Sequence, residues 1–213
     1  MSDIFREIDE ELRRDNWLKL WARYGRYVIA GVVGLLVIAG GVAAWLEHQA
    51  SERRAQSVRY SSALGLGRDG KPAEAAQVFA SIARDGSGYA VLSAFEEAEL
   101  LAKAGDTKAA IAAFDRIAGS SAYDQEFRDA AVLLAVMRGL PEGEAAALIK
   151  RLEPLTASGN PWRATATELT AVARLKAGDN AGALELYRKL ADDLATPQGL
   201  RARAAEMAAA LAP

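Results

Sequence analysis

The side chains that most often carry out catalysis are scarce in this sequence of 213 residues. It contains a single histidine, His48, and no cysteine, which excludes thiolate nucleophiles, disulfides and cysteine-ligated metals. Ser87 lies in the sequence DGSG, which lacks the spacing of a nucleophile elbow. No phosphate-binding loop and no dinucleotide fingerprint occurs. We therefore expect no catalytic residue, no cofactor and no small-molecule substrate.

Acidic side chains form two clusters that could in principle hold a hard cation. One cluster contains Glu96, Glu97 and Glu99, and the other contains Asp192 and Asp193. Neither lies in a ligand loop such as an EF-hand, so we interpret both as solvated helix faces and predict no metal site. The 26 basic and 28 acidic residues give a net charge of −2, which argues against a nucleic-acid partner.

The apolar residues are unevenly distributed, because the stretch 27–46 contains no charged residue. Twenty residues of helix span about 30 Å, the thickness of a bilayer core. A leader of 26 residues with six acidic groups favours an uncleaved anchor over a signal peptide or a buried helix. Within it, Ala30 with Gly34 and Gly40 with Ala44 are pairs of small residues four apart, which would allow another membrane helix to approach closely.

The residues that flank the stretch indicate its orientation. Five basic residues precede it between positions 13 and 26, whereas three follow it between positions 53 and 59. The positive-inside rule then predicts a cytoplasmic segment 1–26, a transmembrane helix 27–46 and an exported domain 47–213. Apolar residues Ile4, Phe5, Ile8 and Leu12 recur at helical spacing in the first segment, which predicts an amphipathic helix on the cytoplasmic leaflet or a docking site for a partner.

The exported part contains internal repeats. Three segments begin at Gly70, Gly105 and Gly178, and each has a small residue five positions later, an aromatic residue nine later and an aliphatic residue twelve later. A degenerate copy has Ala145, Ile149 and Leu152, but Leu140 replaces the glycine. This period resembles the tetratricopeptide repeat, a helix-turn-helix unit of about 34 residues. The predicted fold is all-α, with an N-terminal transmembrane helix followed by an α-solenoid of helical hairpins. An alanine-rich hairpin with a glycine turn would imitate the same pattern.

The resemblance places the first helix of each repeat on the concave side of the solenoid. The first helices of the four repeats are expected near 49–66, 89–104, 125–138 and 162–177, and a capping helix is expected at 198–211. The alignment then turns five residues toward a protein-binding groove: Tyr60, Phe95, Phe127, Leu134 and Met137. The alternative for each of them is packing between neighbouring repeats.

The whole layout also resembles the proteobacterial YfgM family, the ancillary subunit of the SecYEG translocon. The resemblance rests on the N-terminal sequence DIFREIDEELRR, on LKLWARYGRY before the span, and on about 165 residues of degenerate repeats. It implies a non-enzymatic protein of the bacterial inner membrane whose periplasmic domain binds SecYEG, a PpiD-type chaperone and emerging client proteins. The other hypothesis is a tethered assembly factor for cell division or envelope biogenesis, with a role like that of the soluble, secreted coordinator CpoB.

Overall fold

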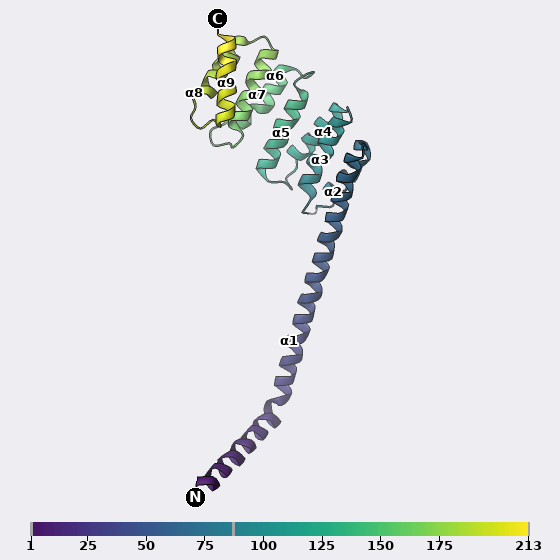
Figure 1. The fold of residues 1–213 in the computed structure, drawn as a ribbon, viewed down its shortest axis with the longest axis vertical. Coiled ribbons are helices and arrows are strands. Elements are labelled where there is room, and N and C mark those ends of the chain that lie inside the picture. The colour runs from purple at the N-terminus through teal and green to yellow at the C-terminus, as the bar shows by residue number, and fades with distance from the viewer. Residues whose placement is uncertain (1, 87, 213) are drawn as a thin grey trace. The chain divides into compact units, whose positions relative to one another are not determined.

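A computed structural model describes the backbone of residues 2–86 and 88–212, and the side chains of residue 18 and of residues 21–86 and 88–212. Within these ranges the chain forms nine α-helices, one short 3₁₀ helix and no strand (Figure 1). The predicted all-α fold is confirmed. The predicted apolar stripe of residues 4–12 and Ser87 fall outside the described side chains.

The chain divides into two compact units, residues 1–55 and residues 56–213. Residues 2–55 of the first unit belong to α1, which runs from Ser2 to Arg68. The described part of α1 contains one stretch, Trp21–Arg68, with a window of mean hydropathy 2.3 of which nothing is buried. That length and composition are compatible with a single-pass membrane anchor.

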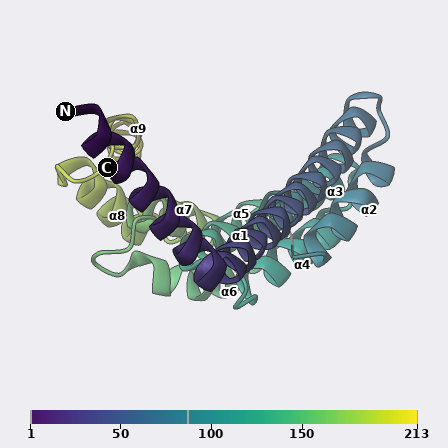
Figure 2. The same cartoon turned by 90° about the horizontal axis from the view of Figure 1, so that it is seen from below.

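The second unit consists of helical hairpins. In the first hairpin, the last three turns of α1 pair with α2 (Pro72–Arg84). The second hairpin consists of α3 (Ala90–Lys103) and α4 (Thr107–Ala118), and the third consists of α5 (Gln125–Gly139) and α6 (Ala145–Leu152). The fourth consists of α7 (Arg163–Lys176) and α8 (Asn180–Asp192). The 3₁₀ helix Glu153–Thr156 follows α6, and α9 (Gln198–Leu211) covers α8. Seen from below, α2–α9 form a curved row, with α3, α5, α7 and α9 on the inner side and α2, α4, α6 and α8 on the outer side (Figure 2).

Glycine ends the first helix of three hairpins, as the repeat pattern predicts. Gly70, Gly105 and Gly178 have φ angles of 77°, 87° and 80°, in the left-handed region that glycine adopts without steric cost. In two of these hairpins, the residue after the glycine is the N-cap of the second helix. Asp106 accepts a hydrogen bond from the backbone N–H group of Ala109, and Asp179 accepts one from the backbone N–H group of Gly182.

The core follows the spacing read from the sequence. The small residues Ala75, Ala110 and Ala183 are completely buried, and the aromatic residues four positions later, Phe79, Phe114 and Tyr187, are at most 2% exposed. Alanine at the first position lets two helices approach closely, while the ring fills the space beside it. Each repeat therefore contributes one compact apolar layer to the solenoid.

The third hairpin departs from this arrangement. Leu140 keeps a right-handed conformation at φ −52°, and α6 begins only at Ala145 and has eight residues. Leu152 is buried as predicted, but Ala145 and Ile149 are only half-buried, and Leu148 is buried instead. Without a left-handed residue the chain needs a longer turn, which shortens the second helix.

Polar contacts connect residues about one repeat apart. Arg138 of α5 pairs with Glu99 of α3 at 2.6 Å, and Arg203 of α9 donates two hydrogen bonds to Glu168 of α7. On the outer helices, Arg151 pairs with Asp115. Trp162 donates its indole N–H to the carbonyl of Glu126 at 3.2 Å. The second, third and fourth hairpins and α9 are thus joined by polar contacts in addition to the apolar layers.

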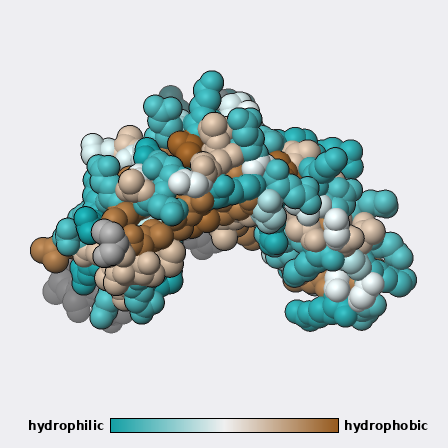
Figure 3. All heavy atoms as spheres, turned by 90° about the horizontal axis from the view of Figure 1, so that it is seen from above, coloured by the Kyte–Doolittle hydropathy of each residue, from teal (hydrophilic) through white to brown (hydrophobic). Residues whose placement is uncertain are grey.

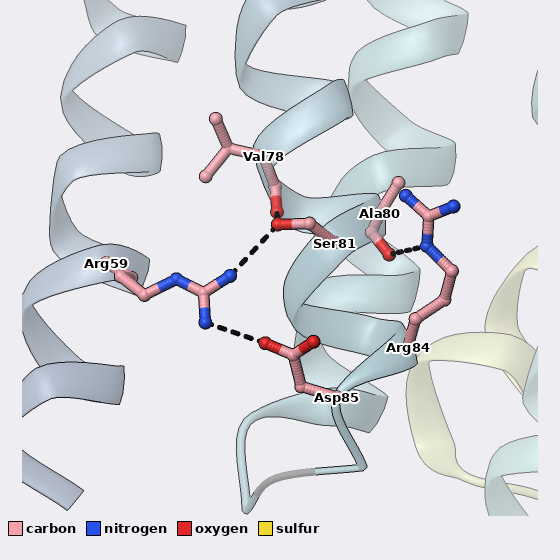
Figure 4. A network of polar contacts seen from close by, with 6 residues as sticks. All are labelled: Arg59, Val78, Ala80, Ser81, Arg84 and Asp85. Carbon is pink, nitrogen blue, oxygen red and sulfur yellow. Dashed lines mark hydrogen bonds and ion pairs between the residues drawn. The ribbon is translucent and has the colours of Figure 1, made fainter. Parts of the chain in front are cut away.

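The first hairpin is closed by a similar contact between α1 and α2 (Figure 4). The guanidinium of Arg59 donates to Asp85 Oδ2 at 2.6 Å and to Ser81 Oγ at 3.1 Å. The Ser81 hydroxyl in turn donates to the carbonyl oxygen of Val78 at 2.7 Å. This network fixes residues 56–68 of α1 as the first helix of the first repeat.

Candidate protein-binding groove

The candidate groove follows the first helices of the repeats, which line the inner side of the curved row (Figure 2). The five residues predicted to line it come from α1, α3 and α5. The structure divides them into two groups by exposure: Tyr60, Phe95 and Leu134 are half-buried, whereas Phe127 and Met137 are 40% and 49% exposed.

Tyr60 packs between two other rings. Its ring centroid lies 5.2 Å from that of Phe79 in an edge-to-face arrangement and 5.0 Å from that of Tyr89. Burial raises the pKa of the Tyr60 hydroxyl above 10.0, and the nearby Glu96 carboxylate raises the pKa further. These contacts match the alternative expectation, in which Tyr60 packs between the first and second repeats.

Phe95 connects the second repeat to the third. Its ring lies 6.1 Å from Phe114 within its own hairpin and 6.4 Å from Phe127 on α5. Leu134 packs against the apolar cluster that contains Phe114. Phe95 and Leu134 therefore contribute to packing as well, while Phe127 and Met137 are exposed large apolar residues of α5.

Two surface features were not predicted from the sequence. Leu92 on α3 is 49% exposed. A pocket of about 430 Å³ lies between the first two repeats, and we call it the first-repeat pocket. Its walls come from the end of α1, the start of α2 and the inner helix α3; they are Ala63, Leu64, Gly67, Arg68, Gly70, Pro72, Phe79, Glu96, Leu100 and Lys103. The repeat alignment contained a signal for it, because Leu64 occupies the position of Glu99 one period earlier.

Several acidic side chains form ion pairs with arginines in the described part of the chain. No group of three or more His, Asp or Glu side chains there could hold a metal ion. Three residues of the two acidic clusters noted in the sequence form ion pairs with arginines. The pairs are Glu97 with Arg116, Glu99 with Arg138, and Asp193 with Arg163. The hydrogen bond from Arg163 lowers the pKa of the Asp193 carboxyl.

The four small residues predicted to contact another membrane helix are all exposed within α1. A methyl group added at Gly34 or Gly40 would meet no atom within 4 Å. Ala30, Gly34, Gly40 and Ala44 are therefore available to a neighbouring helix, and their role in helix packing stays a prediction.

The family model for the tetratricopeptide repeat-like domain matches residues 18–208. This chain belongs to the tetratricopeptide repeat-like family. The matched region includes the apolar stretch 27–46 as well as the hairpins. The tetratricopeptide repeat-like fold is typically a non-catalytic scaffold for protein–protein interaction.

Two solved structures of tetratricopeptide repeats are similar to this chain. Both are of the putative kinesin light chain nearly identical TPR-like repeats of Podosopora anserina, and one of the two is a variant with a single substitution. Each shares 16% sequence identity and covers 73% of this chain and 84% of its own, with TM-scores of 0.54 and 0.53. At this identity the likeness is one of fold. No curated protein matches the chain.

Proposed function

We propose that this protein is a non-enzymatic scaffold of the bacterial inner membrane that holds periplasmic chaperones and emerging client proteins beside the SecYEG translocon. The observation that carries this proposal is the composition of α1. A single helix contains both an uncharged stretch long enough to cross a bilayer and the first helix of a repeat domain of the protein-binding class.

Aromatic residues support a membrane position for the uncharged stretch. Trp21, Tyr24 and Tyr27 precede or begin it, and Trp45 lies at its other end. Each is at least 50% exposed in the structure. Such amphipathic rings favour the headgroup layer on both sides of a bilayer, so their spacing along the helix fits a span across residues 27–46.

The charges near the span support a periplasmic location for the repeat domain. Five basic residues lie within the 14 positions 13–26, and the first basic residue after the span is Arg53. Positively charged flanks stay in the cytoplasm during insertion. A cysteine-free chain is also suited to an oxidising compartment.

The topology has a direct test, because the natural chain has no cysteine. Ser158 is exposed in the turn between α6 and α7, so the variant Ser158→Cys offers one accessible thiol. In intact spheroplasts, a membrane-impermeant maleimide should label it fully. Labelling only after lysis would place the repeat domain in the cytoplasm and contradict the proposal.

The identity of the partners rests on the resemblance to the YfgM family, and the groove supports it in kind. Leu92, Phe127 and Met137 expose apolar surface on inner helices, which is the surface that an extended or helical segment of another protein covers. Hydrophilic residues cover most of the face shown in Figure 3, and hydrophobic residues cover the smaller part of it. Tethered cell-division or envelope assembly, the CpoB-like role, is the second candidate function because the same groove would serve it.

Site-specific crosslinking in native membranes separates the two candidates. A photoreactive amino acid at Val33 probes the span, one at Phe127 probes the groove, and one at Lys189 on the outer helix α8 is the control. We expect SecY or SecE from Val33, chaperone or nascent chain from Phe127, and neither from Lys189. Recovery of only division or peptidoglycan-synthesis proteins would refute the translocon role and support the second candidate.

A further inference from the structure

The first-repeat pocket differs from the corresponding place in the second repeat by one charge. The repeats align with an offset of 35 residues, which relates Leu64 to Glu99 and Lys103 to Arg138. In the second repeat Arg138 Nη2 pairs with Glu99 Oε2 at 2.6 Å and joins α3 to α5. In the first repeat the acidic position holds Leu64, so α1 offers no carboxylate to Lys103.

Three repeats place a cation at the end of their inner helix, and two of these cations have partners. Arg138 pairs with Glu99, and Lys176 Nζ donates to the carbonyl oxygens of Leu140, Pro141 and Gly143 at 2.6–3.1 Å. Lys103 is exposed and has no hydrogen bond or ion pair to the part of the chain that the structure describes. Glu99, one helical turn before Lys103, is already bound by Arg138.

The space beside Lys103 is apolar and open. Phe79 and Leu100 are almost completely buried under it, and Ala63 and Leu64 form part of its wall. Gly67 keeps this space open, because a methyl group there would already lie 3.4 Å from Leu100 Cδ2. The volume of about 430 Å³ is within the range of about 300–1,000 Å³ that ligand pockets occupy.

The rim of the pocket carries a net positive charge. Arg68 and Lys103 lie on it together with a single acid, Glu96. Arg68 also has no ion pair within the described residues. Glu96 lies two helical turns from Lys103 on α3, about 10 Å along the axis, so it leaves the lysine end of the pocket cationic.

We propose that the first-repeat pocket binds a glutamate or aspartate side chain of a partner protein together with the large apolar side chain next to it. The partner carboxylate pairs with Lys103 as Glu99 pairs with Arg138, and the apolar side chain enters the space beside Leu64 and Leu100. The inference rests on the proposed scaffold function and names the chemistry of the segment that the scaffold binds. It does not depend on which protein supplies that segment.

The test uses the full chain in lipid nanodiscs, with carbon-13 labels in the leucine methyl groups of Leu64 and Leu100. The probe is a capped peptide, Ser-Gly-Leu-Glu-Gly-Ser, and matched peptides replace Leu-Glu by Leu-Gln or by Gly-Glu. We expect the Leu-Glu peptide to shift both methyl signals with a Kd of about 1 mM. It should bind about three- to tenfold more tightly than either matched peptide.

Two variants, each with a matched control, locate the binding energy. Lys103→Met should reduce the difference between Leu-Glu and Leu-Gln to less than about twofold, whereas Lys108→Met, which removes another exposed lysine, should leave it unchanged. Gly67→Leu should fill the pocket and abolish the shifts. Gly65→Leu is its control on the same helix, because a Cβ atom added there meets no atom within 4 Å.

The variant Leu64→Glu supplies the missing carboxylate within the chain and should suppress binding while the repeat stays folded. If it unfolds, as circular dichroism would show, Lys103→Met and Gly67→Leu still decide the question. Equal affinity for Leu-Glu and Leu-Gln would overturn the proposal, as would unshifted Leu64 and Leu100 signals at about 5 mM peptide. Stronger binding of Ser-Gly-Ser-Gly-Leu with a free carboxyl terminus would overturn the assignment to an acidic side chain. Loss of SecYEG crosslinks alone would refute the scaffold's location and leave these peptide results standing.

Discussion

Replacing the turn glycines by alanine should destabilise the repeat domain by an amount that the backbone alone determines. At Gly105 and Gly178 the φ angles are 87° and 80°, and an added methyl group would meet no atom within 4 Å. A left-handed conformation costs a residue with a Cβ about 1–2 kcal/mol. Alanine recovers about 0.4–1 kcal/mol by restricting the unfolded chain. We therefore expect each substitution to lower the free energy of unfolding by about 1 kcal/mol.

The control is Gly65→Ala, which has the same free space around the added methyl group but lies within α1 with a helical φ angle. It should raise stability by up to about 1 kcal/mol, since alanine is the better helix former. Leu140→Gly should be destabilising despite restoring the repeat consensus, because Leu140 is already right-handed and packs on the third apolar cluster.

Thermal unfolding of the full chain in mild detergent, followed by far-ultraviolet circular dichroism, measures these effects. For a unit of the size of 56–213, about 1 kcal/mol corresponds to a change in Tm of about 2–4 °C. Gly105→Ala and Gly178→Ala should lower Tm, and Gly65→Ala should raise it. A common direction of change for all three, or a rise with Leu140→Gly, would refute the argument from turn conformation.

Three further perturbations test other parts of the molecule. Lys176→Met removes three hydrogen bonds to the turn between α5 and α6. It should lower the free energy of unfolding, measured by urea denaturation, by about 1–2 kcal/mol, whereas Lys150→Met should leave it unchanged. The pKa of Asp193 is lowered in the folded protein, so the ionised carboxylate stabilises the fold above its ordinary pKa of 3.8, and this contribution is lost as the pH falls through the lower folded value. The variant Asp193→Asn should therefore make Tm less dependent on pH over about pH 5 to 2. An unchanged pH profile would exclude the hydrogen bond from Arg163 as the cause. Gly34→Ile should reduce crosslinking from the span if the small residues contact a partner helix, and full crosslinking would assign that face to lipid.

The repeat architecture was readable from the sequence because its signals are local. A glycine at each turn, a small residue five positions later and an aromatic residue nine later all lie on one hairpin, and their roles at Gly70, Ala75 and Phe79 follow from backbone geometry and side-chain size. The helices predicted at 89–104, 125–138, 162–177 and 198–211 are confirmed within a few residues. The helix predicted at 49–66 ends two residues before the end of α1, but its predicted start is wrong, because α1 is continuous from Ser2 to Arg68. At Leu140 the missing glycine indicated a degenerate repeat, and the structure shows the longer turn that results.

The candidate groove was less readable, because exposure on an inner helix depends on neighbours that the sequence pattern does not identify. Tyr60 and Phe95 have the spacing of groove residues, yet rings from adjacent helices cover part of each. The first-repeat pocket exists because Leu64 provides no carboxylate and Gly67 provides no side chain. The effect of these two residues becomes visible only when α1 and α3 are placed together in the fold.

The short third hairpin also determines how the repeat domain responds to force. In a linear array of repeats, each unit contacts only its neighbours, so every interface carries the same applied force. The least stiff interface therefore deforms most. Helix α6 has eight residues, and its Ala145 is only half-buried where the corresponding Ala110 and Ala183 are completely buried. We therefore expect a partner that pulls on the two ends of the array to change its curvature mainly at this hairpin.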